Sequence, residues 1–269
     1  MTSRLSDVLA ATRAEGRAAL VGYLPVGYPT VSGSIAAMRA MVDGGCDIIE
    51  VGLPYSDPVL DGPTIQAAVE AALRGGARTD DVFRAVAGVT DRGAPAVVMT
   101  SWNPVERRGV RRFADDLRAA GGSGVILPDI VPEEAGEWLE AAAATDLDSV
   151  FLVAPSSTDA RIASTVAACR GFVYAASLMG VTGTRSAVSG SASVIVDRVR
   201  AATDSLPVCV GLGVSNAAQA AEVAAYADGV IVGSAFVRAL LDAPDEAAGL
   251  VAVRRLAEDL AAGVRSGRS

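Results

Sequence analysis

Eight short apolar segments recur along the chain, and the stretches between them carry apolar residues three or four positions apart. Continuous apolar strands that alternate with amphipathic helices are typical of a parallel sheet covered by helices. Eight such units, with no change of composition along the chain, predict one (β/α)8 TIM barrel across residues 1–269. The predicted strands are residues 19–23, 47–52, 96–100, 124–127, 149–153, 172–176, 208–211 and 229–232.

Two further features of the N-terminal region bear on the fold. Leu5, Val8 and Leu9 predict an extra amphipathic helix before the first strand. The alternative architecture is an open doubly wound sheet, which would call for a glycine fingerprint after the first strand. That place holds LPVGYPT, so we favour the closed barrel.

Composition and charge narrow the class of protein. Half of the residues are hydrophobic and a fifth are charged, which fits a compact enzyme domain. Apolar runs are broken well before the roughly 18 residues that a membrane span needs. The N-terminus carries charges where a signal peptide would have an apolar centre, so we expect a cytoplasmic protein. The net charge of −8, without a basic stripe, disfavours a nucleic-acid partner.

The residue types that are missing exclude several chemistries. The chain has no histidine and no lysine, so a Ser-His-Asp triad and a Schiff-base lysine are both excluded, and the commonest metal ligand is absent. The three cysteines, Cys46, Cys169 and Cys209, lie far apart among small or apolar neighbours and are interpreted as reduced core thiols. Acids, tyrosines and backbone groups remain for catalysis.

The segment IIEVGLPYSDPVLDGPTIQ (residues 48–66) holds the strongest catalytic candidates. Glu50 lies inside a buried strand, where ionisation is unfavourable unless the carboxylate is paired. Asp61 follows eleven residues later, at the end of a proline-rich loop that could return over the strand end. Such a pair suits proton transfer combined with stabilisation of positive charge. The alternative is that Glu50 is a satisfied core acid and Asp61 a helix N-cap.

In a TIM barrel the active site lies at the carboxyl ends of the strands, and three glycine-rich pieces fall there. Residues 179–193 follow the sixth predicted strand, GLGVSN (211–216) the seventh and GSAF (233–236) the eighth. Glycine lets the backbone approach an anion, and the free amides at a helix start supply donors. We therefore expect a phosphate site here. Tight turns are the alternative reason for Gly211 and Gly213, but they leave Gly233 and Ser234 unexplained.

The order and spacing of these motifs resemble the tryptophan synthase α-subunit family. IEVGLPYSDPVLDGPTIQ is followed by GVTGTR, GLGVS and VGSAFV, and the likeness also includes YLPVGYPT and TSWNPV, so that it covers nearly the whole chain. The resemblance implies a lyase of tryptophan biosynthesis. It would cleave indole-3-glycerol phosphate to indole and D-glyceraldehyde 3-phosphate by a retro-aldol reaction, without cofactor or metal.

The resemblance also implies roles for individual residues. Glu50 would be the general acid-base and Asp61 the carboxylate that accepts a hydrogen bond from the indole N–H. Residues 179–193 would close over the substrate. The residues implied in substrate binding are Tyr23, Tyr174, Thr182, Gly183, Gly211, Gly213, Gly233 and Ser234.

A partner is implied as well. Residues 54–61 would dock on a tryptophan synthase β chain, a pyridoxal-phosphate enzyme that receives the indole. The resemblance also implies an α2β2 heterotetramer. The α chain itself would carry no pyridoxal phosphate.

The sequence departs from the family pattern in two places, and three other functions stay open. Ser101 stands where a tyrosine is more usual, and Arg107 and Arg108 stand where an aromatic is. If Ser101 borders the indole pocket, the loss of aromatic area would weaken substrate packing by roughly a kcal/mol or two. The rivals are another phosphate-binding barrel, a non-catalytic subunit that activates a β chain, and a stand-alone indole producer. The clustered acids and the missing lysine argue against the first, and the retained Glu50 and Asp61 argue against the second.

Overall fold

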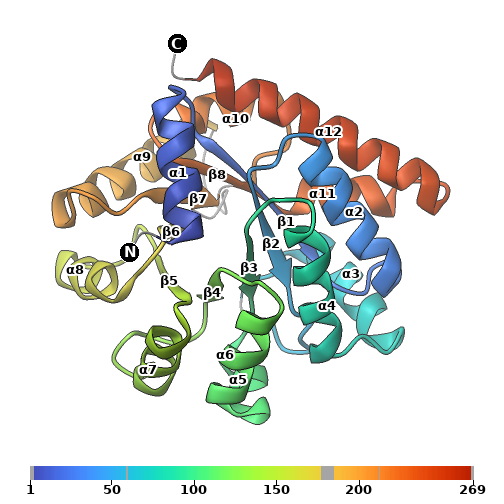
Figure 1. The fold of residues 1–269 in the computed structure, drawn as a ribbon. Coiled ribbons are helices and arrows are strands. Elements are labelled where there is room, and N and C mark those ends of the chain that lie inside the picture. Colours follow the sequence, from blue (N-terminus) through green and yellow to red (C-terminus); the bar gives the residue numbers. More distant parts are fainter. Residues whose placement is uncertain (1–2, 59, 177–184, 212, 268–269) are drawn as a thin grey trace.

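The computed structural model describes residues 3–58, 60–176, 185–211 and 213–267, and in it parallel strands close into a barrel in chain order (Figure 1). Each strand pairs with the next, and β8 pairs with β1. The strands are β1 (Ala19–Pro25), β2 (Ile48–Gly52), β3 (Ala96–Met99), β4 (Gly124–Leu127), β5 (Asp148–Val153), β6 (Val173–Ala176), β7 (Val208–Gly211) and β8 (Gly229–Val232). The predicted TIM barrel is therefore confirmed.

Helices surround the barrel, and one closes its amino end (Figure 1). Leu5 and Leu9 of the first helix are buried against the residues inside the barrel, so the predicted extra helix is confirmed as a plug. The helices are α1 (Arg4–Ala14), α2 (Val31–Asp43), α3 (Pro63–Arg74), α4 (Thr79–Thr90), α5 (Trp102–Arg108), α6 (Val110–Ala119), α7 (Gly136–Thr145), α8 (Asp159–Ala168), α9 (Arg185–Ala202), α10 (Ala217–Ala224), α11 (Ser234–Leu241) and α12 (Glu246–Ser266). None of the described helices is long and apolar enough to cross a bilayer.

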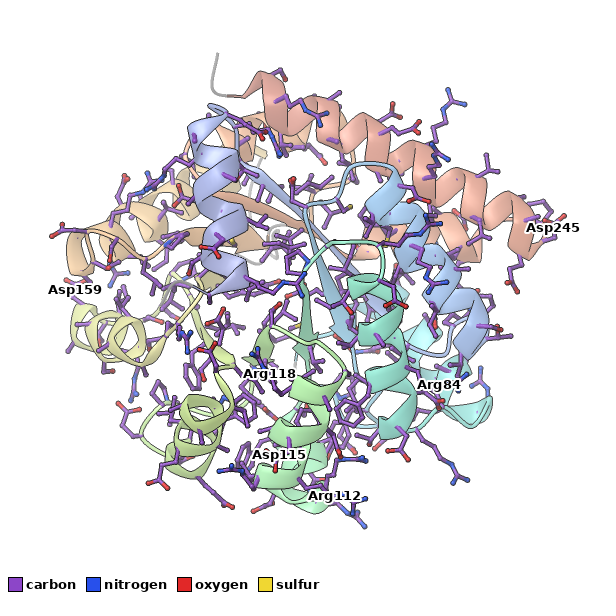
Figure 2. The ribbon with its side chains drawn as sticks, viewed as in Figure 1. Arg84, Arg112, Asp115, Arg118, Asp159 and Asp245 are labelled. Carbon is purple, nitrogen blue, oxygen red and sulfur yellow. The ribbon has the colours of Figure 1, made fainter. Side chains whose placement is uncertain are left out.

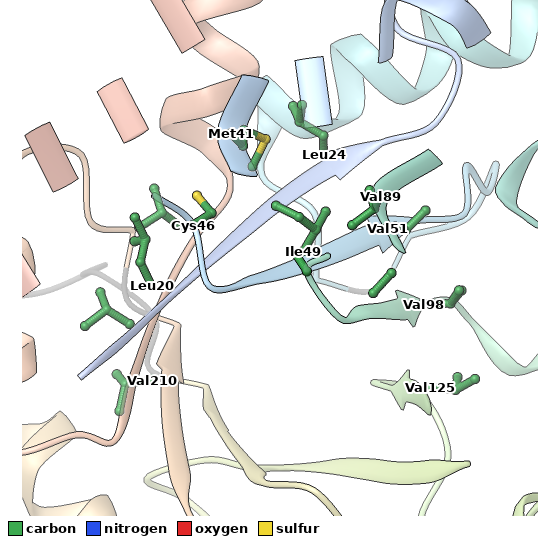
Figure 3. Close-up of a cluster of buried hydrophobic side chains, with 14 of the residues drawn as sticks. Leu20, Leu24, Met41, Cys46, Ile49, Val51, Val89, Val98, Val125 and Val210 are labelled. Carbon is green, nitrogen blue, oxygen red and sulfur yellow. The ribbon is translucent and has the colours of Figure 1, made fainter. Parts of the chain in front are cut away.

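Alternation along the strands divides the core in two, because successive side chains of a strand point to opposite faces. Inward-facing side chains such as Val21, Ile48, Val97 and Ile126 form a cluster inside the barrel. Outward-facing ones, including Leu20, Ile49, Val51, Val98 and Val125, pack beneath the helices (Figure 3). The inner alternation continues toward the carboxyl ends of the strands and sets which side chains reach the mouth of the barrel.

Two element boundaries differ from the prediction by more than one residue, each for an identifiable reason. Strand β1 continues two residues beyond Tyr23, because Leu24 and Pro25 still pair with Val51 and Gly52 of β2. Residues 185–193, expected as part of a glycine-rich loop, open helix α9. The buried Ala192, Ile195, Val196 and Val199 of that helix repeat at helical spacing. The first part of the expected loop, residues 179–184, lies outside the described residues.

Candidate active site

A cavity of about 430 Å³ opens at the carboxyl ends of the strands, where a TIM barrel carries its active site. Its walls come from β1, β2, β3, β6, β7 and β8 and from the start of α3 and α11. The lining residues are Tyr23, Glu50, Leu60, Asp61, Gly62, Pro63, Thr64, Ile65, Met99, Tyr174, Ala176, Gly211, Gly213, Ile231, Gly233 and Ser234. Every site residue expected from the sequence and described by the structure is among them.

Glu50 is an uncompensated acid at the base of this cavity. It follows the inward-facing Ile48 by two positions on β2, so its side chain enters the barrel. The residue is 1 % exposed, and its Oε1 has no hydrogen-bond partner among the described residues. Burial raises the pKa of the carboxyl to about 8. Glu50 is thus not a satisfied core acid, and it can hold a proton at neutral pH.

Asp61 reaches the same cavity from the loop between β2 and α3. It is not the N-cap of α3, because Gly62 occupies that position and Pro63 begins the helix. The side-chain amide of Gln66, one turn into α3, donates a 2.7 Å hydrogen bond to the carbonyl oxygen of Asp61. Partial burial raises the pKa of the Asp61 carboxyl. The backbone of Asp61 is therefore held by the helix while its carboxyl remains available to a ligand.

Two tyrosines form the walls between the acid and the glycines, and neighbouring glycines leave room for their rings. A Cβ at Gly52 would lie 2.6 Å from the hydroxyl oxygen of Tyr23. A Cβ at Gly211 would lie 2.4 Å from the hydroxyl oxygen of Tyr174. Burial raises the pKa of both phenols well above the ordinary value, and the nearby carboxyls add to the shift. Gly211 therefore has a packing reason besides any contact with an anion.

The far wall presents backbone donors. Gly213 adopts φ +68°, a conformation that glycine takes without strain. Gly233 precedes α11, whose first helical hydrogen bonds are donated by Phe236 and Val237 to the Gly233 carbonyl. The amides of Ser234 and Ala235 come before those bonds and form part of the positive end of the helix dipole. No arginine lines the described part of the cavity, so an anion here would rely on backbone groups.

Two expected site residues cannot be placed, and several residues that line the cavity belong to no sequence motif. Thr182 and Gly183 lie outside the described residues. The apolar wall includes Leu60, Ile65, Met99 and Ile231, which were not predicted. For Met99 the available signal was its position two residues after the inward-facing Val97 on the same strand. Such alternation would have identified it.

The two departures from the family pattern lie away from the cavity wall. Ser101 is buried and precedes α5, and it is not among the described lining residues. Arg108 contacts Asp80 at 2.7 Å and Asp116 at 2.6 Å, and its guanidinium stacks on the ring of Phe83. Arg108 therefore joins helices α4, α5 and α6 and has a structural role in this chain.

Carboxyl and thiol groups are the metal-ligand side chains that this chain contains. Within the described ranges no three Asp, Glu or Cys side chains cluster as a metal site would need. Cys46 and Cys209 are buried and Cys169 is half-buried, and all three are free thiols. The described cavity thus offers a substrate the carboxyl pair, backbone donors and the hydroxyls of its tyrosine, serine and threonine residues.

Comparison with known proteins assigns the family. The model of the family described as tryptophan synthase alpha chain matches residues 9–265. The tryptophan synthase alpha chain of Streptomyces avermitilis is 63% identical over 98% of this chain and 95% of its own length. The alpha chain of Nocardia farcinica is 61% identical over 98% and 97%.

Solved structures at both high and low sequence identity share the fold of this chain. A chain of tryptophan synthase from M. tuberculosis in an open form superposes with a TM-score of 0.91 at 57% identity, covering 98% of this chain and all of that one. The alpha subunit from Legionella pneumophila gives a TM-score of 0.88 at 28% identity, covering 98% and 99%. With a family match over residues 9–265 and relatives above 60% identity, the chain belongs to the tryptophan synthase alpha chain family, the lyase subunit that works with a beta chain.

Proposed function

We propose that this chain cleaves indole-3-glycerol phosphate to indole and D-glyceraldehyde 3-phosphate, with Glu50 and Asp61 as its catalytic groups. The observation that carries the proposal is the buried Glu50 carboxyl, with its unpartnered Oε1 and a pKa of about 8, in one cavity with the helix start at Gly233 and Ser234. A neutral acid at one side and backbone donors at the other match an indole ring carrying a glycerol phosphate.

The first step is protonation of the ring. Glu50 donates its proton to the indole carbon that bears the glycerol side chain, and the ring becomes cationic. The indole N–H then donates to the Asp61 carboxylate, an attraction that grows with the charge on the ring and so lowers the barrier. Glu50, now ionised, is left in an apolar environment in which it is a stronger base than in water.

The second step breaks the carbon–carbon bond. Glu50 takes the proton of the glycerol hydroxyl next to the ring, and the electrons of that O–H bond form the aldehyde carbonyl. The electrons of the broken carbon–carbon bond return to the ring and restore neutral indole. Glu50 ends the cycle protonated, so one carboxyl serves as acid and then as base.

The remaining residues bind the substrate. Gly211, Gly213, Gly233 and Ser234 would hold the phosphate through backbone amides and the Ser234 hydroxyl, as their place on the cavity wall supports. Tyr23 and Tyr174 would bound the space between the phosphate and the ring. Thr182 and Gly183 stay predictions from the family resemblance.

The beta chain of the family would contact the loop of residues 54–61 in an α2β2 assembly. It would hold the pyridoxal phosphate and take up the indole, while this chain would carry no cofactor. A cytoplasmic location stays a prediction from the N-terminal sequence. Light scattering of the mixed chains would give the stoichiometry, and a mass other than that of two copies of each would reject the α2β2 assignment.

The test is indole release from indole-3-glycerol phosphate by the purified chain, with and without an added tryptophan synthase beta chain. Slow release alone and much faster release with the beta chain support the proposal. Fast release without it would indicate a stand-alone indole producer. Absence of release in both cases would reject the lyase assignment and revive the non-catalytic subunit.

A further inference from the structure

Helices α3 and α11 contact each other on one side of the barrel, and each begins at the wall of the active-site cavity (Figure 1). Helix α11 begins at Ser234, in the proposed phosphate site, and α3 begins at Pro63, two residues after Asp61. The carboxyl assigned to the indole end of the substrate and the donors assigned to the phosphate end therefore stand at the starts of two adjoining helices.

The start of α3 has no side-chain cap. Its N-cap residue is Gly62, which has no side chain to accept a hydrogen bond from the first turn. Two other side chains contact this end of the helix. Gln66 donates to the carbonyl oxygen of Asp61 from within α3, and Arg238 donates from α11. The bond from Arg238 joins the start of α3 to a second helix.

Arg238 bridges the two helices through one hydrogen bond. Its Nη2 donates to the hydroxyl oxygen of Thr64 at 2.8 Å. Thr64 is the second residue of α3 and lines the cavity. Arg238 follows Ser234 by four positions in α11, so the two side chains lie on the same face of that helix. The bridge therefore connects the face of α11 that carries Ser234 with the first turn after Asp61.

This bond fixes a position more than it adds stability. Arg238 is exposed, and no Asp or Glu among the described residues forms an ion pair with it. A hydrogen bond between an exposed guanidinium and a neutral hydroxyl orders a long side chain, and the entropy lost offsets most of the gain. Its effect is therefore expected on the placement of α3 and less on the free energy of unfolding.

We propose that Arg238 is a positioning residue for the lyase reaction, which holds the start of α3, and with it the Asp61 carboxyl, in place relative to the phosphate end of the substrate. Arg238 does not line the described cavity, so it acts through Thr64 and not by touching the substrate. The proposal rests on the proposed function, in which Asp61 stabilises the cationic ring. That attraction is strongest in the transition state, so a displacement of Asp61 by about 1 Å would lower kcat more than substrate affinity.

The experiment measures kcat and KM for indole release from indole-3-glycerol phosphate by the full-length chain. The variants are Arg238→Ala, Arg238→Lys, Thr64→Val and Asp61→Asn, and Arg238→Ala is also combined with each of the last two. Amide hydrogen exchange of residues 61–70, urea denaturation and the Kd of inorganic phosphate are measured on the same proteins.

Arg84→Ala is the matched control. Arg84, which projects from α4 in Figure 2, is likewise an exposed helical arginine with one 2.8 Å side-chain hydrogen bond, donated to Asp81. It does not line the described cavity, so its replacement should leave kcat and the exchange of residues 61–70 as in the parent.

We expect Arg238→Ala to lower kcat about tenfold, with KM and the Kd of inorganic phosphate within about twofold of the parent. Arg238→Lys can still donate to Thr64 and should recover most of the rate. In the Asp61→Asn or Thr64→Val background, Arg238→Ala should have little further effect on kcat, because residues that act through one group are not additive. Residues 61–70 should exchange faster in Arg238→Ala than in Arg84→Ala, with similar urea midpoints.

Four results would count against a role or separate the two proposals. Parent-like kcat in Arg238→Ala, or full additivity with Asp61→Asn, overturns the positioning role. A raised KM with weaker binding of inorganic phosphate and an unchanged kcat also overturns it, because Arg238 would then bind the phosphate itself. A parent that releases no indole with or without the beta chain rejects the lyase assignment. Faster exchange of residues 61–70 in Arg238→Ala would then still support the hold on α3, and unchanged exchange would overturn it as well.

Discussion

Glu50 on β2 lies directly beside Tyr23 on β1 in the parallel register, and both side chains line the cavity. Tyr23 is 7% exposed and Glu50 1%, so both side chains are shielded from water. Burial is the main cause of the raised pKa of each group, and Glu50 and Asp61 raise that of Tyr23 further. The pair therefore stays neutral at neutral pH, which is the state that proton donation to a substrate requires.

Replacement of Glu50 by glutamine tests the acid-base assignment. Glu50→Gln keeps the shape of the side chain but cannot give or take the proton, so we expect indole release to fall by about 10² to 10⁴ or more. The fold and phosphate binding should persist, and circular dichroism with inorganic phosphate titration checks both. Substantial residual indole formation would remove Glu50 from this role.

The pH dependence of cleavage follows from the same carboxyl. Because Glu50 must be protonated at the start and its pKa is about 8, kcat/KM should decline as the pH rises through about 8. Steady-state kinetics over roughly pH 6 to 10 measure this decline of kcat/KM. A rate that stays constant to well above pH 8 would show that another group supplies the proton.

Stability should change with pH over a window set by Glu50. The folded pKa of about 8 lies above the ordinary value of 4.5, so the stability associated with the neutral acid is complete below about pH 4.5 and is lost as the pH rises to about 8. Glu50→Gln removes this loss of stability, which is on the order of a few kcal/mol when the pKa difference is converted to free energy. The variant should therefore melt above the parent at pH 9 and close to it near pH 5. Equal melting curves at pH 9 would contradict a buried, unpaired carboxylate.

Asp61→Asn tests the second carboxyl. The amide keeps the loop geometry, which the Gln66 bond to the Asp61 carbonyl supports, but offers no negative charge to the cationic ring. We expect kcat to fall by about 10² or more, with a smaller change in KM, because the lost attraction is strongest in the transition state. A near-normal kcat would mean that the indole N–H is bound elsewhere.

The barrel was predictable because its signal is repeated eight times. Each buried strand is a short apolar run, and the observed bounds of β4, β7 and β8 coincide with those expected. The end of β1 was misplaced because continued pairing with β2, which is a tertiary effect, carries the strand past Tyr23. The start of α9 was misjudged because residues 185–193 have the glycine and serine content of a loop, whereas the buried face farther along sustains the helix.

The site was predictable in part. Glu50 and Asp61 stand out because an acid in an apolar strand and one in a proline-rich loop are unusual, and position in the barrel brings them to one face. The apolar wall formed by Met99 and Ile231 has no such signal beyond strand alternation. The reason for Gly211 could not be read from the sequence, because it depends on the ring of Tyr174 from the neighbouring strand.

Gly211→Ala tests that packing relationship. The new Cβ would lie 2.4 Å from the Tyr174 hydroxyl oxygen and 2.8 Å from its ring, so the ring must move within the cavity. We expect a loss of about 1–3 kcal/mol in the free energy of unfolding and a raised KM for indole-3-glycerol phosphate. Urea denaturation and steady-state kinetics measure the two effects. Combining the change with Tyr174→Phe, which removes the hydroxyl, should restore part of both. Unaltered KM and stability in Gly211→Ala would mean that the ring relaxes freely.

Ser149→Ala tests a buried polar contact far from the catalytic acids. The indole nitrogen of Trp138, on α7, donates a 2.9 Å hydrogen bond to the hydroxyl of Ser149 on β5, and both residues are buried. Removal of the hydroxyl leaves a buried N–H without its acceptor, which costs about 1–3 kcal/mol. Urea denaturation should show this loss, whereas Ser164→Ala, at an exposed position on α8, should stay within about 0.5 kcal/mol of the parent. Equal stability of the two variants would imply that the Trp138 N–H finds another acceptor, and indole release should be unaffected in either case because neither serine lines the described cavity.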